Sequence, residues 1–175
     1  MNIFVGCSSR DEISKDYLDL ATQVGDCLNG AHFIIGGTFR GMMGSVVKNI
    51  PRGDITQIIL KDYADSGVLS SKQYQICETS FERMERIWNE TDVFLILPGG
   101  TGTLGEIITF LEENRMKSEK KKIIVFNYRG FYDQIVAFIQ DAKEQHFCND
   151  DILEGLIFID DIPDILNLLK EEQRV

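Results

Sequence analysis

The sequence predicts a doubly wound α/β fold, a mostly parallel sheet of about seven strands flanked by helices. Short apolar, β-branched runs alternate with longer segments whose apolar residues recur at helical spacing. Two central runs, VFLIL (93–97) and IIVF (123–126), are apolar at every position, which is typical of strands buried on both faces. The length of 175 residues, with 43% hydrophobic and 26% charged residues, fits one globular domain spanning residues 1–175.

The individual elements follow from these patterns in chain order. Seven strands are predicted, at Asn2–Gly6, His32–Ile35, Ile55–Leu60, Gln75–Cys77, Asp92–Leu97, Ile123–Phe126 and Leu156–Ile159. Helical periodicity predicts helices at Ser14–Leu28, Leu104–Met116 and Phe131–Gln145. Residues 61–73 form a polar stretch without clear periodicity, either a functional flap or a simple excursion of the chain.

Charge and cysteine content exclude several classes of protein. The formal net charge of −10 argues against nucleic acid or an anionic membrane as the main partner. No apolar run approaches the roughly 20 residues that span a bilayer, and the amino terminus lacks the features of a signal peptide. Four scattered cysteines and two histidines have no metal-site spacing. We therefore expect a cytoplasmic protein without a metal or other cofactor.

The stretch LILPGGTGTLGE (95–106) contains the first candidate ligand site. It places a Gly-rich loop between a predicted strand and a predicted helix, where ligands bind in open α/β sheets. Glycines leave backbone N–H groups accessible, and a helix start adds unpaired donors and partial positive charge. We therefore predict an anion site, with phosphate as its usual occupant, at Gly99, Gly100, Thr101, Gly102 and Thr103.

The same letters allow other interpretations. GTGTLG matches GxGxxG, but a dinucleotide fingerprint belongs in the first strand-to-helix turn, and the required acidic residue is missing after the next strand. No Gly-Lys-Ser/Thr follows, so the Walker A pattern also fails. Thr103 and Glu106 could form a capping box at the helix start. Glu106 could equally face the sugar of a bound sugar phosphate, and the local pattern leaves both possibilities open.

Two longer segments carry a resemblance to a known family. IIGGTFRGMMGSV (34–46) and SFERMERIWNETDVFLILPGGTGTLGE (80–106) resemble the lonely guy (LOG) family, once labelled lysine decarboxylase-like. The family pattern is an arginine in a helix, then a strand, then PGGxGTxxE, and here Arg83 and Glu106 fall at its catalytic positions. NYRGFYD (127–133) is also similar to a family segment. Met84 and Gly105 depart from the family pattern, because a lysine and an acid are usual there.

The resemblance implies an enzyme, a cytokinin riboside 5′-monophosphate phosphoribohydrolase. It would hydrolyse the N-glycosidic bond of a nucleoside 5′-monophosphate, releasing free base and ribose 5-phosphate, with Arg83 and Glu106 catalytic. Gly37 and Ser8 are further candidate ligand contacts, although Ser8 could instead cap the first helix. A homodimer with the site near its interface is also implied. A non-catalytic nucleotide-binding module and a hydrolase for a pyrimidine monophosphate are the alternatives.

Arg83 has a second interpretation when the resemblance is set aside. Its local sequence favours an exposed helix residue paired with Glu82 or Glu85. Nearby, Phe81, Met84 and Trp88 could form either an apolar interface or part of the core.

Overall fold

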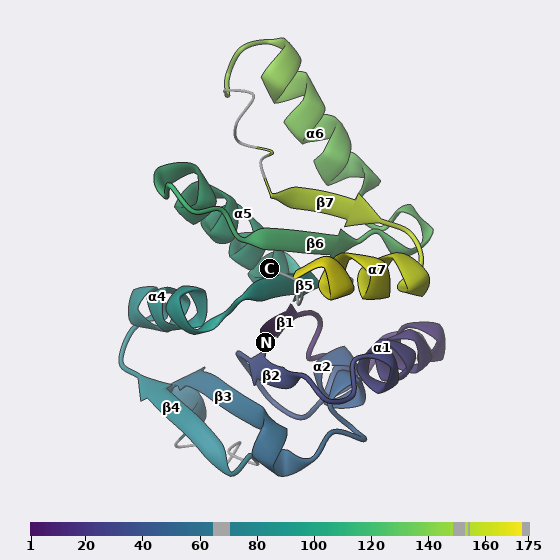
Figure 1. The fold of residues 1–175 in the computed structure, drawn as a ribbon, viewed down its shortest axis with the longest axis vertical. Coiled ribbons are helices and arrows are strands. Elements are labelled where there is room, and N and C mark those ends of the chain that lie inside the picture. The colour runs from purple at the N-terminus through teal and green to yellow at the C-terminus, as the bar shows by residue number, and fades with distance from the viewer. Residues whose placement is uncertain (65–70, 149–152, 154, 173–175) are drawn as a thin grey trace.

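The computed structural model describes residues 1–64, 71–148, 153 and 155–172. Seven parallel strands form one sheet in the order β4-β3-β2-β1-β5-β6-β7 (Figure 1). The strands are β1 (Asn2–Gly6), β2 (His32–Ile35), β3 (Ile55–Leu60), β4 (Gln73–Cys77), β5 (Val93–Ile96), β6 (Lys122–Phe126) and β7 (Leu156–Ile159). The doubly wound α/β prediction is confirmed, and the sheet is wholly rather than mostly parallel.

The strand predictions agree closely with the structure. β1, β2, β3 and β7 have the predicted bounds. β4 begins two residues earlier than predicted, at Gln73, and β6 begins at Lys122. β5 is one residue shorter at each end than predicted.

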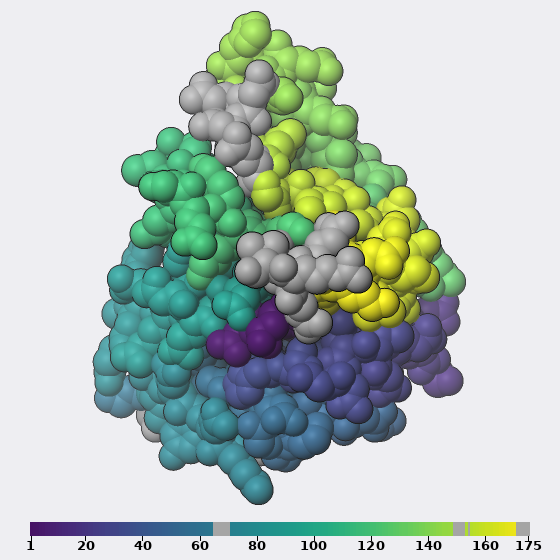
Figure 2. Space-filling view, in the orientation of Figure 1, coloured from purple at the N-terminus to yellow at the C-terminus, as the bar shows by residue number. Residues whose placement is uncertain are grey.

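Helices cover both faces of the sheet. One face packs against α1 (Lys15–Cys27), α2 (Gly41–Val46) and α7 (Ile162–Glu172), with a cluster of buried residues between them. The other face packs against α4 (Ser80–Glu90), α5 (Thr101–Met116) and the start of α6 (Asp133–Glu144). A short helix, α3 (Lys61–Ala64), follows β3. In the space-filling view the molecule narrows toward the end that α6 occupies (Figure 2).

The sheet has a topological switch point between β1 and β5. From β1 the chain builds outward through β2, β3 and β4, and then returns to place β5 on the other side of β1. The connections leaving β1 and β5 therefore diverge, which opens space beyond the carboxyl ends of these two strands. Gly6 and Ile96 are paired at this edge. The Gly-rich loop that follows β5 accordingly begins at the switch point.

One predicted helix start is wrong, and one possible helix cap is not used. α5 begins at Thr101 with Gly100 as its N-cap, so the predicted start at Leu104 and the Thr103–Glu106 capping box are not formed. α1 is capped by the Ser14 side chain, which accepts a hydrogen bond from the Asp16 N–H, so Ser8 does not cap it. Several Ser, Thr and Gly residues near each of these helix starts could serve as its cap, and only one of them does so.

The polar stretch at 61–73 is partly regular. Lys61–Ala64 forms α3, and the last residue of the stretch, Gln73, opens β4. The middle of the stretch, residues 65–70, lies outside the described part of the chain, so the flap prediction falls partly on residues outside it. Among the described residues, no helix is long and apolar enough to cross a membrane.

Candidate active site at the carboxyl edge of the sheet

Arg83 lies on the inner side of α4 and reaches across the sheet edge. Its Nε donates to the Ile58 carbonyl at 3.1 Å, and its Nη2 donates to the Gly36 carbonyl at 2.9 Å. The same Nη2 lies 3.1 Å from Glu106 Oε1. The Arg83 side chain is only 15% exposed, so the interpretation as an exposed residue paired with a helix neighbour is wrong.

The neighbouring acid on α4 has a different partner. Glu82 pairs with Arg86 at 2.9 Å, one turn along the helix. Its backbone N–H donates to Thr79 Oγ1, which caps the helix. Glu82 is thus held by Arg86 and by the helix start, whereas the Arg83 side chain donates to oxygen atoms outside α4.

Glu106 lies on α5, in the second turn of the helix, and its side chain is 11% exposed. Burial raises the pKa of Glu106, because the ionised form loses its hydration, while the charge and hydrogen bond of Arg83 act in the opposite direction. The structure therefore holds one buried carboxylate and one partly buried guanidinium as a hydrogen-bonded ion pair. Such pairs are costly to bury and are maintained only with good geometry and further hydrogen bonds.

Two glycines make room for this ion pair. A Cβ added at Gly36 would collide with Arg83 Nη2, and a Cβ added at Gly6 would lie 2.8 Å from Glu106 Oε2. Gly6 is the last residue of β1, and Gly36 directly follows the last residue of β2. Gly6 was not predicted to belong to the site, whereas Gly36 lies in the Gly-rich segment 34–46 on which the family resemblance rests. The available signal was a glycine at the carboxyl end of an otherwise apolar strand.

The loop after β5 leads into α5 beside the pair. A Cβ at Gly99 would collide with the Thr103 side chain, which folds back over this glycine and is buried. Gly100 and Gly102 have open space where a side chain would be, and Thr101 is exposed. The first N–H groups of a helix have no partner within it and carry partial positive charge. The structure thus places an accessible helix start next to Glu106.

Ser8 and Gly37 lie at the same edge of the sheet. The Ser8 N–H donates to the Pro98 carbonyl at 3.1 Å, so the turn after β1 adjoins the loop after β5. Ser8 Oγ accepts the Arg10 N–H at 3.2 Å. The Gly37 carbonyl accepts a hydrogen bond from the fully buried Gln57 at 3.0 Å. Gly37 therefore helps to fix the turn after β2. The carbonyl of the preceding residue, Gly36, accepts the hydrogen bond from Arg83.

An exposed cluster of hydrogen bonds joins the turn after β1 to the turn after β2, and it was not predicted from the sequence. Asp11 accepts the Arg40 Nε–H at 2.7 Å and the Gly41 N–H at 2.9 Å. Hydrogen bonds from Arg40 and Gly41 lower the pKa of Asp11. Gly41 has φ of 57°, and a Cβ there would lie 2.5 Å from the Arg10 carbonyl oxygen. The residue must be glycine because both its conformation and its neighbours exclude a side chain.

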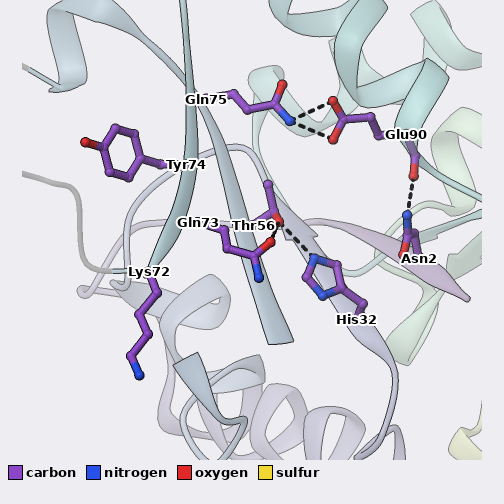
Figure 3. Close-up of a pocket in the computed structure, with 8 residues that line it drawn as sticks. All are labelled: Asn2, His32, Thr56, Lys72, Gln73, Tyr74, Gln75 and Glu90. Atoms are coloured by element: carbon purple, nitrogen blue, oxygen red, sulfur yellow. Dashed lines mark hydrogen bonds between the residues drawn. The ribbon is translucent and has the colours of Figure 1, made fainter. Parts of the chain in front are cut away.

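A second polar region lies at the opposite, amino edge of the sheet. A hollow of about 570 Å³ is lined there by Asn2, His32, Thr56, Lys72, Gln73, Tyr74, Gln75 and Glu90. His32 Nε2 lies 2.8 Å from Thr56 Oγ1, which is 3.3 Å from Gln73 Oε1, while Gln75 donates to both oxygens of Glu90 (Figure 3). Lys72 and Tyr74 point away from this network (Figure 3). Within the described ranges no group of His, Cys, Asp and Glu side chains could hold a metal ion.

Known proteins similar to this chain give a consistent result. The family model described as possible lysine decarboxylase matches residues 31–169. Cytokinin riboside 5′-monophosphate phosphoribohydrolase LOG2 of Arabidopsis thaliana is 26% identical, over 97% of this chain and 82% of its own length. The enzyme of that name from Mycobacterium tuberculosis is 24% identical, over 86% of this chain and 84% of its own.

Solved structures with the same fold have other names. The molybdenum cofactor carrier protein of Chlamydomonas reinhardtii superposes with a TM-score of 0.70 at 14% identity, covering 99% of both chains. The molybdenum cofactor binding protein of Rippkaea orientalis gives a TM-score of 0.69 at 17% identity, covering 97% of this chain and 95% of that one. At such identities the likeness is one of fold.

Proposed function

We propose, because this chain belongs to the possible lysine decarboxylase (LOG) family, that it hydrolyses the N-glycosidic bond of a nucleoside 5′-monophosphate. Water would add its hydroxyl to the anomeric carbon as the bond to the base nitrogen breaks. The remaining proton would end on the leaving base, so that free base and ribose 5-phosphate are formed. The substrate would be a cytokinin riboside 5′-monophosphate, as in the names of the relatives, or a similar nucleotide such as AMP.

The observation that carries this proposal is the buried Arg83–Glu106 pair beside the start of α5. A glycosidic transition state develops positive charge on the sugar, and a carboxylate close to the anomeric carbon stabilises that charge. A carboxylate can also orient or deprotonate the attacking water. We assign both roles to Glu106, whose raised pKa makes it a better base than an exposed glutamate.

Arg83 is better suited to holding Glu106 than to binding phosphate. Its guanidinium already donates to two backbone carbonyls and to the carboxylate. These bonds fix the plane of the guanidinium and keep a positive charge next to Glu106, which favours the ionised carboxylate. We therefore propose that Arg83 positions Glu106 and keeps it charged, while the substrate phosphate binds elsewhere.

The phosphate would bind at the start of α5. The N–H groups of Thr101, Gly102 and Thr103 belong to the first turn, and two glycines leave the approach to them open. A 16-residue helix presents aligned peptide dipoles at this point. Glu106 lies on the next turn of the same helix. One helix would therefore bind the phosphate with its first turn and place a carboxylate near the sugar with its second.

We also propose a homodimer that uses the outer side of α4 and α5. Phe81 is 86% exposed and Met116 is 70% exposed, and an adjacent hollow of about 510 Å³ is lined partly by Met84 and Trp88. Of the three residues Phe81, Met84 and Trp88, Trp88 is buried in the core. Phe81 is the one that offers an exposed apolar contact. α4 would then carry Arg83 on one side and the dimer contact on the other. Phe81→Glu should convert a dimer to a monomer in sedimentation velocity.

The proposed reaction is tested with a panel of purine, N⁶-substituted purine and pyrimidine nucleoside monophosphates. Free base is separated by chromatography, and ribose 5-phosphate is measured in the same samples. Release from adenine nucleotides supports the proposal, and release from pyrimidine nucleotides supports the alternative hydrolase. Binding without release would make the chain a nucleotide-binding module, the alternative that the Met84 and Gly105 departures support. The cytoplasmic location stays a prediction.

A further inference from the structure

The segment NYRGFYD (127–133) has an unusual backbone. It follows β6 as a short 3₁₀ turn, Tyr128–Gly130, in which Arg129 has φ of 56° and Gly130 has φ of 71°. The left-handed conformation is unfavourable for a residue with a Cβ, such as arginine. A conformation of this kind persists where surrounding contacts require it. The contacts around this turn show what it holds in place.

The turn holds Tyr132 at the start of α6. Asn127 Oδ1 accepts the Tyr132 N–H at 2.7 Å, and Asn127 Nδ2 donates to Asp133 Oδ1 at 2.8 Å. The Asn127 N–H is in turn held by the Ile159 carbonyl of β7 at 2.8 Å. Tyr132 is 3% exposed, with its ring edge-on to Phe131. This chain of contacts fixes the tyrosine to the end of the sheet.

The Tyr132 hydroxyl lies behind the candidate active site. It donates to the Leu97 carbonyl at 2.9 Å, in a buried hydrogen bond. Leu97 directly precedes Pro98 and Gly99, and its own N–H donates to the Gly6 carbonyl at 2.9 Å. Burial raises the pKa of Tyr132, with Cys7 and Glu106 adding to the effect and a backbone hydrogen bond from Gly99 opposing it. The phenol therefore stays protonated and keeps its ability to donate.

We propose that Tyr132 is a positioning residue, which sets the direction of the loop from Gly99 to Thr103 and thereby the phosphate-binding N–H groups. Its hydroxyl holds the Leu97 carbonyl, two residues before Gly99, and it does so from the N-cap position of α6. This inference rests on the proposed function, because it assumes that the loop binds phosphate. Tyr132 itself need not touch the substrate.

The test is Tyr132→Phe, which keeps the ring and its packing and removes the hydroxyl. Tyr128→Phe is the matched control, because it removes a phenol hydroxyl from the same segment and the described residues provide no hydrogen bond to it. Two quantities are measured on each full-length variant: ribose 5-phosphate affinity by calorimetry, and kcat/KM for AMP and for adenosine. Thermal melting checks that each variant folds.

A lost buried hydrogen bond should weaken ribose 5-phosphate binding about tenfold in Tyr132→Phe. The preference for AMP over adenosine should fall by a similar factor, with adenosine hydrolysis little changed. Tyr128→Phe should match the wild type. Equal losses on AMP and adenosine, or unchanged ribose 5-phosphate affinity, would overturn the positioning role. If the wild type binds ribose 5-phosphate but hydrolyses neither compound, the proposed function fails, whereas the tenfold weakening in Tyr132→Phe would still support the inference.

Discussion

The two edges of the sheet contain polar groups of very different kinds. At the amino edge, His32, Thr56 and Gln73 hydrogen-bond to one another around a hollow of about 570 Å³. At the carboxyl edge, Arg83 and Glu106 form an ion pair whose side chains are 15% and 11% exposed. The amino edge therefore has a hollow lined by polar side chains, whereas the carboxyl edge has an ion pair that is largely shielded from solvent.

This difference shows why the hollow is the weaker guide to function. Partly exposed polar side chains that satisfy one another stabilise a strand edge and need no ligand. A buried ion pair costs desolvation energy, and an apolar pair of similar size is often equally stable. Glycines at positions 6 and 36 further remove the side chains that would fill the space the pair occupies. The carboxyl edge therefore keeps a costly arrangement that stability alone does not explain.

Glu106→Gln should have the largest effect. The amide keeps the size of the side chain and an oxygen that can accept from Arg83, but it cannot carry charge or take a proton. We expect kcat for base release to fall about 10³-fold, the range found for loss of a general base. Turnover is measured with saturating nucleotide.

Glu112→Gln is the matched control for this change. Glu112 lies on the same helix in an exposed pair with Arg115 at 2.8 Å, so its charge is worth little. Activity within twofold of wild type is expected. If Glu106→Gln retained as much activity as Glu112→Gln, the carboxylate would have no role in the reaction.

Gly36→Ala should have the next largest effect. The added methyl group would displace the Arg83 guanidinium and, with it, Glu106. A displacement of about 1 Å in a catalytic group can cost about 100-fold in rate, and overpacking should cost about 2 kcal/mol of stability. Gly53→Ala provides the control near the amino edge, because a Cβ there meets nothing within 4 Å. Equal activity in the two variants would show that the glycine under Arg83 is dispensable.

The raised pKa of Glu106 predicts two pH effects of opposite sense. Activity needs the carboxylate, so kcat/KM should fall about tenfold per pH unit below the folded-state pKa, at a pH above the ordinary glutamate range. Stability changes the other way. The folded state binds the proton more tightly than the unfolded state, so the contribution of Glu106 to the unfolding free energy falls as pH rises from the ordinary to the raised pKa.

Denaturant unfolding of wild type and Glu106→Gln across this pH window measures the second effect. As pH rises, the unfolding free energy of Glu106→Gln should increase relative to that of the wild type. Two results together would show that the pKa of Glu106 is not raised in the folded protein. The difference in unfolding free energy would be independent of pH, and kcat/KM would fall only at the ordinary glutamate pKa.

The strands were predictable because parallel strands buried on both faces are apolar at every position. β5 and β6 were recognised from that pattern alone. β4 is an edge strand with exposed Gln73 and Tyr74, so its first two residues had no apolar signal. The start of α5 was misplaced because glycines and threonines are poor helix formers, and tertiary structure overrides that preference.

The site was only partly predictable for a related reason. Glu82 and Glu85 were the natural local partners for Arg83, whereas its observed partner lies 23 residues away on another helix. It was the resemblance to a family, and not the local pattern, that connected Arg83 with Glu106. The need for glycine at Gly6 depends on how closely two elements approach, which no spacing in the sequence records.

Thr56→Val should have the smallest effect and tests the amino edge directly. Valine has nearly the shape of threonine, so the change removes the hydroxyl between His32 and Gln73 with little effect on packing. We expect a loss of about 1 kcal/mol in unfolding free energy and kcat/KM within twofold of wild type. A tenfold loss of activity at unchanged stability would instead mean that the amino edge takes part in the reaction. The contrast between the two edges would then fail, because a satisfied polar network would have proved as functional as a buried ion pair.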